Sequence, residues 1–148
     1  MGGLELYMNM LSGELPSQIG SLKQLEVLSL YNNEITGQIP TSLYDLKAIK
    51  VLLLSSNKFT GALSSDVVNM TSLENLSLFD NNLEGQVPLE LEKLRNLKEM
   101  NISYNMFSGL VSKNLASLDT LNMTMLNDKG VAIILEVAKD NTAIASED

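Results

Sequence analysis

A pattern of apolar residues, asparagine and glycine returns every 24 residues along most of this chain. The residues 24 positions after Leu28, Leu30, Asn33 and Gly37 are again leucine, leucine, asparagine and glycine. The later units repeat this pattern with an apolar residue in each leucine column. Five consecutive units follow without insertion or deletion, and a degenerate sixth begins at Leu121. A helical period would drift against these fixed columns, and glycine in every unit would weaken a helix. The chain is therefore expected to fold as a stack of repeats.

Each unit predicts one short strand followed by an inward turn. In residues 28–30 two leucines flank a serine, which places the leucines on one face of a strand. Strands from stacked units then form one parallel sheet with a buried face and an open face. At the turn, an asparagine side chain offers both a donor and an acceptor to unpaired backbone groups. We interpret the asparagine column as a structural hydrogen-bonded ladder. It consists of Asn9, Asn33, Asn57, Asn81 and Asn105.

Three positions after the glycine, three units have a proline and two have a serine. The prolines are Pro16, Pro40 and Pro88, and the serines are Ser64 and Ser112. The fixed φ of proline favours an extended stretch over a helix interior. Each unit therefore combines a strand, a turn with glycine, and a second extended stretch.

The composition excludes several classes of function. The chain has no cysteine and no histidine, so zinc, haem and histidine-assisted nucleophiles lose their usual residues. The formal net charge of −8 argues against binding to a phosphate backbone. Its apolar runs are far too short for a membrane span. We expect no enzyme activity, no cofactor, no metal, no nucleic-acid partner and no direct membrane span in this chain.

These residues resemble the plant-type extracellular leucine-rich repeat, LxxLxLxxNxLxGxIPxxLxxLxx. Residues 33–40, Asn-Glu-Ile-Thr-Gly-Gln-Ile-Pro, match it most closely, and residues 81–88 come next. That family includes the ectodomains of receptor-like kinases and receptor-like proteins, and the inhibitors of polygalacturonases. The resemblance implies an α/β-type solenoid, which is a right-handed superhelix with a parallel sheet on its concave face. It also implies a second short strand after the Gly-x-Ile-Pro turn, and an extracellular or plasma-membrane location.

The two ends depart from the family pattern. We expect leucine-rich repeats over residues 1–126 and a non-repeat tail over 127–148 that caps the last repeat. In the sixth unit Thr124 stands at a leucine position and Lys129 at the asparagine position. Cap cysteines, kinase motifs and a signal peptide are missing from the sequence. These departures favour a fragment, a truncated gene product or a degenerate copy, and they leave a cytoplasmic location open.

The resemblance implies recognition of a protein or peptide ligand, or of a co-receptor, in signalling or defence. Three alternatives stay open: a free inhibitor of a wall-degrading enzyme, an intracellular scaffold, and a truncated piece of a receptor-like kinase. Exposed aromatic anchors and apolar area between the leucines indicate where a partner would bind. The candidate partner-binding residues are Tyr7, Tyr31, Val51, Leu53, Phe79, Asp80, Glu99 and Tyr104. Tyr31, Leu53, Phe79 and Tyr104 are expected at the centre of the contact surface.

Four Asn-x-Ser/Thr sequons provide candidate glycosylation sites at Asn69, Asn75, Asn101 and Asn122. Asn69 falls away from the sheet, where a glycan would be harmless. Asn75 and Asn101 fall on the sheet, where a glycan would block binding. We therefore expect Asn69 to be the most readily modified if the chain is secreted.

Overall fold

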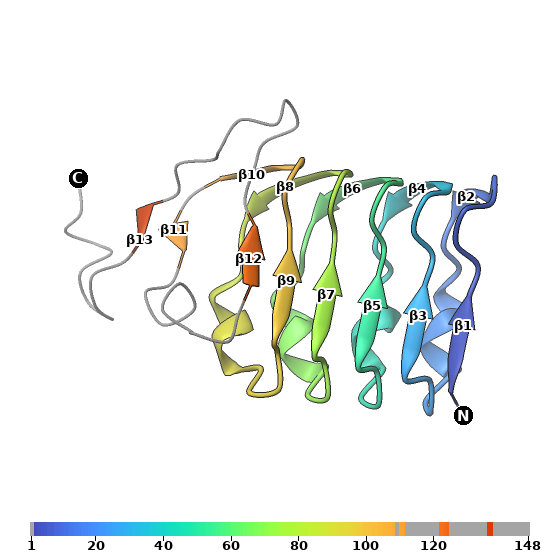
Figure 1. Ribbon diagram of the computed structural model, residues 1–148, viewed down its shortest axis with the longest axis horizontal. Helices are drawn as coiled ribbons and strands as arrows, with labels where there is room; N and C mark the ends of the chain where they lie inside the picture. The colour runs from blue at the N-terminus through green and yellow to red at the C-terminus, as the bar shows by residue number, and fades with distance from the viewer. Residues whose placement is uncertain (1, 109, 112–121, 125–135, 138–148) are drawn as a thin grey trace.

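The chain winds into a solenoid in which each repeat makes one turn (Figure 1). The structure is a computed structural model that describes residues 2–108, 110–111, 122–124 and 136–137. Strands from successive units line one side as a parallel sheet in the order β1-β3-β5-β7-β9-β12. Its strands are β1 (Gly3–Glu5), β3 (Val27–Ser29), β5 (Val51–Leu53), β7 (Asn75–Ser77), β9 (Glu99–Asn101) and β12 (Asn122–Thr124). We call the side of this sheet that faces away from the core the open face.

The register of the six-stranded sheet follows the columns of the sequence. Val27 pairs with Val51, and Val51 with Asn75, so partners stand 24 positions apart. The last pairing differs, because Met123 lies opposite Met100 and partners there stand 23 positions apart. The sequence pattern put Thr124 at the leucine position of the sixth unit, and this was wrong. A shift by one residue moves a strand's side chains to the opposite faces, and the observed register puts an apolar residue in the leucine column.

A second parallel sheet has the order β10-β8-β6-β4-β2 and lies at the other end of each turn. Its strands are β2 (Ser12–Glu14), β4 (Glu34–Gln38), β6 (Lys58–Ala62), β8 (Asn82–Gln86) and β10 (Met106–Ser108). The second strand was expected after the Gly-x-Ile-Pro turn, but it ends before the Ile-Pro pair. The strand ends at the same column in β6, where Ser64 replaces the proline, so the absence of the proline N–H is not what ends it.

Short 3-10 helices close the first four turns on the side away from the six-stranded sheet. They are η1 (Ser17–Ser21), η2 (Thr41–Asp45), η3 (Ser65–Asn69) and η4 (Leu89–Lys93). Each begins directly after the proline column, and Pro40 itself is extended at φ −64° and ψ 140°. Gly20 lets η1 and η2 approach, since a Cβ there would lie 2.5 Å from the carbonyl oxygen of Ser42. No helix in the described part of the chain is long and apolar enough to cross a membrane.

The core is one continuous apolar column enclosed by the two sheets and the helices. Phe59 and the leucines of the central units, such as Leu54 and Leu78, have no exposed surface. From the predicted tail the structure describes only β13 (Glu136–Val137), which pairs in parallel with β11 (Leu110–Val111). The remainder of the tail, over which the cap was expected, lies outside the described residues.

Candidate ligand-binding face

The asparagine column holds neighbouring units together. Asn57 donates from Nδ2 to the carbonyl oxygen of Leu30 in the preceding unit at 2.9 Å, and to that of Leu54 in its own unit at 3.2 Å. Its Oδ1 accepts from the backbone N–H of Ile35 at 3.0 Å. The same three kinds of bond recur at Asn33, Asn81 and Asn105. Among the described residues no unit lies before Asn9, and its side chain donates there to carbonyls of its own turn.

A residue in the left-handed backbone conformation forms the corner between each of the first five strands of the six-stranded sheet and the asparagine that follows it. This column has φ between 54° and 61° and consists of Met8, Asn32, Ser56, Asp80 and Tyr104. Sequence reasoning treated these positions as open strand residues and missed the corner. Asparagine and aspartate tolerate this conformation, but methionine, serine and tyrosine do so rarely, so composition alone gave no consistent signal. The corner turns Asp80 and Tyr104 to the rim of the open face.

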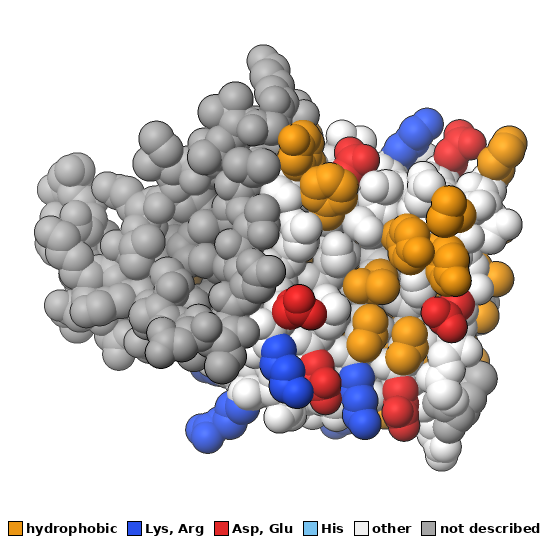
Figure 2. Space-filling model, in the orientation of Figure 1, with side chains coloured by type: hydrophobic (Ala, Val, Ile, Leu, Met, Phe, Trp, Pro, Cys, Tyr) orange, Lys and Arg blue, Asp and Glu red, His pale blue; other side chains and the backbone are white. Residues whose placement is uncertain are grey.

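The first three units present an apolar patch on the open face. The rings of Tyr7 and Tyr31 stack at a centroid distance of 4.7 Å with an interplanar angle of 2°. Val27, Val51 and Leu53 continue the patch and are half-buried. Figure 2 shows hydrophobic side chains gathered over β1, β3 and β5. We call these five residues the N-terminal apolar patch.

Buried at the N-terminal apolar patch lies an unpaired hydroxyl. Ser29 is paired in register with Glu5 on one side and Leu53 on the other. Its side chain is 1% exposed, and its Oγ has no hydrogen-bond partner among the described residues. The side chains around Ser29 therefore pack closely enough to cover its hydroxyl.

A second aromatic pair lies two units away at the rim. Phe79 and Tyr104 meet edge to face at a centroid distance of 5.1 Å and an angle of 70°. Asp80 is exposed beside them, and its backbone N–H donates to the carbonyl oxygen of Ser103 at 3.0 Å, which fixes this corner against the next unit. Figure 2 shows an acidic side chain beside hydrophobic ones at the upper ends of β7 and β9. We call Phe79, Asp80 and Tyr104 the aromatic–acidic corner.

The eight candidate residues thus form two groups and one outlier. Tyr7, Tyr31, Val51 and Leu53 belong to the N-terminal apolar patch, and Phe79, Asp80 and Tyr104 to the aromatic–acidic corner. Ser55 stands between the aromatic pairs, in the column of Tyr31 and Phe79. The outlier is Glu99, which lies at the start of β9, five residues before Tyr104, and accepts from Nδ2 of Asn75 at 3.3 Å.

The lysines near the sheet are paired with glutamates of the preceding unit. Nζ of Lys50 lies 3.7 Å from Glu26, and Nζ of Lys98 lies 3.8 Å from Glu74. Lys58 and Glu34 form a similar pair at 3.9 Å beside the second sheet. These exposed pairs contribute little stability. Lys50 and Lys98 directly precede β5 and β9, and so they lie at the opposite ends of the strands from the left-handed corners. The open positions of units one to five, which are those between and after the leucines of each strand, carry no lysine or arginine.

The sequons occupy different environments. Asn69 is exposed at the end of η3, on the helix side. Asn75 lies in β7, where its amide bonds to Glu99. Asn101 lies in β9, and its Oδ1 accepts from the backbone N–H and the hydroxyl of Ser103 at 3.1 Å and 2.6 Å. The fourth, Asn122, lies in β12 opposite Glu99.

Tyr44 compensates for a missing proline, and sequence reasoning overlooked it. Ser64 stands in the proline column and has an N–H that proline lacks; this N–H donates to the Tyr44 hydroxyl at 3.2 Å. Burial raises the pKa of the Tyr44 phenol above its usual value, partly opposed by that hydrogen bond. A serine at a proline position signals an extra donor in need of a partner. Which side chain supplies the partner depends on the fold.

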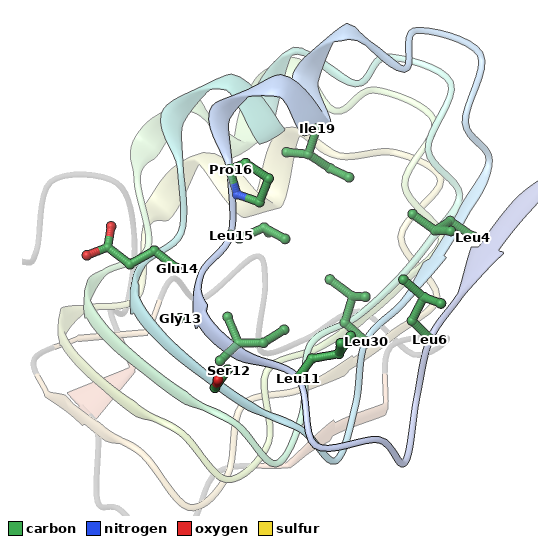
Figure 3. Close-up of a pocket in the computed structure, with 11 residues that line it drawn as sticks. Leu4, Leu6, Leu11, Ser12, Gly13, Glu14, Leu15, Pro16, Ile19 and Leu30 are labelled. Carbon is green, nitrogen blue, oxygen red and sulfur yellow. The ribbon is translucent and has the colours of Figure 1, made fainter.

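The solenoid has an open N-terminal end. A cavity of about 270 Å³ opens there, lined by apolar side chains that include Leu6, Leu11, Leu15 and Ile19. Figure 3 shows these side chains pointing inward from the first unit toward Leu30 of the second. The cavity is the end of the core, and its lining offers no arrangement of titratable groups for catalysis. Among the described residues no three histidine, cysteine or carboxylate side chains gather to hold a metal ion.

Solved structures similar to this chain are plant receptor ectodomains. The ectodomain of the receptor kinase SOBIR1 from Arabidopsis thaliana is 29% identical, with a TM-score of 0.80, over 90% of this chain and 72% of that one. The BIR3–SERK2 complex from the same plant gives 30% identity and a TM-score of 0.75, over 88% of this chain and 71% of that one.

A third similar structure is much longer than this chain. The ectodomain of GASSHO1/SCHENGEN3 from Arabidopsis thaliana, in complex with CASPARIAN STRIP INTEGRITY FACTOR 2, is 29% identical with a TM-score of 0.77. The match covers 93% of this chain but 18% of that ectodomain. No curated protein sequence matches this chain. The sequence model of the leucine-rich repeat region matches residues 4–137, and the chain therefore belongs to the leucine-rich repeat family.

Proposed function

We propose that this chain is a protein- or peptide-recognition module of a cell-surface receptor-like protein and binds its ligand on the open face of the six-stranded sheet. The observation that carries the proposal is the N-terminal apolar patch. Tyr7 is exposed there, and the other four residues of the patch are half-buried, so the patch keeps apolar surface that the fold does not cover. Contiguous exposed apolar area of this kind is typical of interaction sites.

The relatives support the same assignment. The HAESA ectodomain from Arabidopsis thaliana was solved with an IDA peptide hormone ligand, and that of GASSHO1/SCHENGEN3 with CASPARIAN STRIP INTEGRITY FACTOR 2. We extend from them to this chain an extracellular location, a peptide or protein ligand, and a role in signalling or defence. Asn69 is then the sequon we expect to carry a glycan, because it lies on the helix side and leaves the open face free.

Selection from a random peptide library tests the proposal. Peptides of about 12 residues are long enough to cross five strands spaced ~4.8 Å apart. They are selected on the immobilised chain of residues 1–148, and the affinities of the selected peptides are measured by isothermal titration calorimetry. We expect the double variant Tyr31→Ala/Phe79→Ala to weaken binding by about tenfold or more, since buried aromatic anchors dominate binding energies.

A matched control separates the open face from the rest of the surface. Leu89→Ala removes an exposed apolar side chain from η4 on the helix side, and it should leave the affinity unchanged. If Leu89→Ala weakened binding as much as the double variant, or if the double variant bound normally, the open face would not be the binding surface.

A further inference from the structure

We infer that the ligand of the open face is an extended peptide that carries a large apolar residue and a lysine or arginine about four positions apart. The inference rests on the proposed function and specifies the ligand class of that same face. The apolar residue binds the N-terminal apolar patch, and the basic side chain binds the aromatic–acidic corner.

The charges of the open face call for a cation on the ligand. In units one to five its open positions carry the carboxylates Glu5, Asp80 and Glu99 and no lysine or arginine. The nearby lysines Lys50 and Lys98 lie in ion pairs with Glu26 and Glu74. Within the described residues, the Asp80 carboxylate has neither an ion pair nor a side-chain hydrogen bond. Among these residues Glu5 is likewise without such a partner, but only Asp80 directly follows a ring of the edge-to-face pair, and we therefore assign the basic side chain to Asp80.

The aromatic–acidic corner has the composition that recognises an ammonium or guanidinium group. A cation is attracted to an aromatic ring face within about 6 Å of its centroid. Phe79 and Tyr104 stand edge to face at 5.1 Å, so their ring planes differ in direction. Asp80 directly follows Phe79 and occupies the same column as Tyr104 one unit earlier, about 4.8 Å away across the sheet. A single cation can therefore contact a ring and the carboxylate together.

The N-terminal apolar patch offers a contrasting environment. Its tyrosine rings are stacked parallel, Val51 and Leu53 extend it, and Ser29 beside it is sealed from water. Glu5 lies at the edge of this patch, in register with Ser29, but the neighbours of Val51 and Leu53 across the sheet carry no charge. A charged group placed over Val51 and Leu53 would lose hydration without gaining a partner. The two sites therefore select opposite kinds of side chain.

The spacing between the two sites sets the spacing in the ligand. Tyr31 lies in the second unit, and the aromatic–acidic corner spans the fourth and fifth units. The two sites are therefore separated by between two and three strand spacings. At ~4.8 Å per spacing this is roughly 12 Å, or about four residues of extended peptide at ~3.3 Å each. A ligand crossing the strands therefore places its apolar and basic side chains about four positions apart.

The test uses the selected peptides and the variant Asp80→Asn. Asparagine keeps the size of aspartate and tolerates the left-handed backbone at φ 60°, so the corner should stay intact. We expect the selected peptides to be enriched in a basic residue about four positions from a large apolar one. Asp80→Asn should weaken their binding about twofold to fivefold, which is the range of an exposed ion pair. Replacing the basic residue by glutamine should weaken binding more, because it also removes the contact of the cation with the ring. Asp45→Asn, in η2 on the helix side, is the matched control and should have no effect.

The outcomes separate this inference from the proposed function. If face-dependent peptides emerge without basic residues, or if Asp80→Asn binds them as tightly as the original chain, the inference is overturned while the open face remains the binding surface. If Tyr31→Ala/Phe79→Ala leaves every selected peptide bound, the proposed function fails and the inference with it. A basic preference that is equal in Asp45→Asn and Asp80→Asn would reduce it to the general attraction of a net charge of −8.

Discussion

The first unit and the third unit have the same sequence pattern but different surroundings. Leu6 and Leu54 stand in one column, yet Leu6 is 40% exposed and Leu54 is fully buried. Asn9 and Asn57 also share a column, but only Asn57 bonds to a preceding unit. The column therefore decides which side chain points inward, and the neighbouring unit decides whether it is buried. Stability in such an array resides in the contacts between units.

The largest effect is expected from removing the same leucine at the two positions. Leu54→Ala should lower the free energy of unfolding by about 3–4 kcal/mol, because it leaves a cavity in a closed part of the core. Leu6→Ala should cost less than ~1 kcal/mol, because the open end already exposes the side chain to water. Urea denaturation followed by circular dichroism measures both. Equal losses would show that the first unit is as well covered as the third.

The asparagine ladder gives the next largest contrast. Asn57→Ala should cost about 2–3 kcal/mol, since it leaves the buried N–H of Ile35 without its partner and removes one of the two amide donors, Asn57 and Asn33, from the carbonyl of Leu30. Asn9→Ala should cost under ~0.5 kcal/mol, because Asn9 is exposed and bonds only within its own turn. The same denaturation curves decide between them. A cost at Asn9 close to that at Asn57 would contradict a ladder that works between units.

A smaller effect is expected where one unit supplies a partner for the next. Tyr44→Phe should cost about 1 kcal/mol by leaving the N–H of Ser64 unpaired. Adding Ser64→Pro should restore part of the loss, because proline has no N–H and Pro40 shows that the column accepts its geometry. The restoration is partial because proline also removes the bond from the N–H of Asp66 to the Ser64 hydroxyl at 3.0 Å. The exposed Pro16 of the first unit needs no such partner. Failure of Ser64→Pro to restore stability would show that the hydroxyl acts by packing alone.

The same phenol makes the molecule sensitive to alkali. Burial raises the pKa of Tyr44, so the folded state favours the neutral phenol. This contribution to stability is complete below the unfolded pKa of about 10 and is lost as the pH rises from there through the folded value. Raising the pH above about 10 should therefore lower the melting temperature of the original chain more steeply than that of Tyr44→Phe, which has no phenol at this position to titrate.

Most of the fold could be predicted because its signal is periodic. The fixed columns of leucine and asparagine indicate which residues share a face, and parallel stacking follows from that. The register of the sixth unit was misplaced, because a deletion of one residue leaves little trace in composition. The second strand was misplaced, because the sequence does not show where a strand ladder ends. Only neighbouring backbones reveal them.

The candidate site was less accessible to sequence reasoning. The open face could be assigned from the alternation around Leu28, and its aromatic residues could be named. Their division into two pairs could not, because the pairing of Phe79 with Tyr104 joins adjacent columns across the left-handed corner. Likewise, Tyr44 and Ser64 are far apart in sequence and meet only after two units stack.

The smallest effect concerns two serines of the open face that are equally buried and differently bonded. Ser29 and Ser103 are each 1% exposed, but only the Ser103 hydroxyl has a partner, the Oδ1 of Asn101 at 2.6 Å. Ser29→Ala removes an unpaired buried hydroxyl and should stabilise the chain by about 0.5 kcal/mol, whereas Ser103→Ala should destabilise it by about 1 kcal/mol. Glu5, the exposed residue in the column of Ser29 in the first unit, should tolerate alanine without either change. Melting curves of the three variants under one set of conditions measure the order, and a destabilising Ser29→Ala would mean that the hydroxyl has a partner in the folded chain.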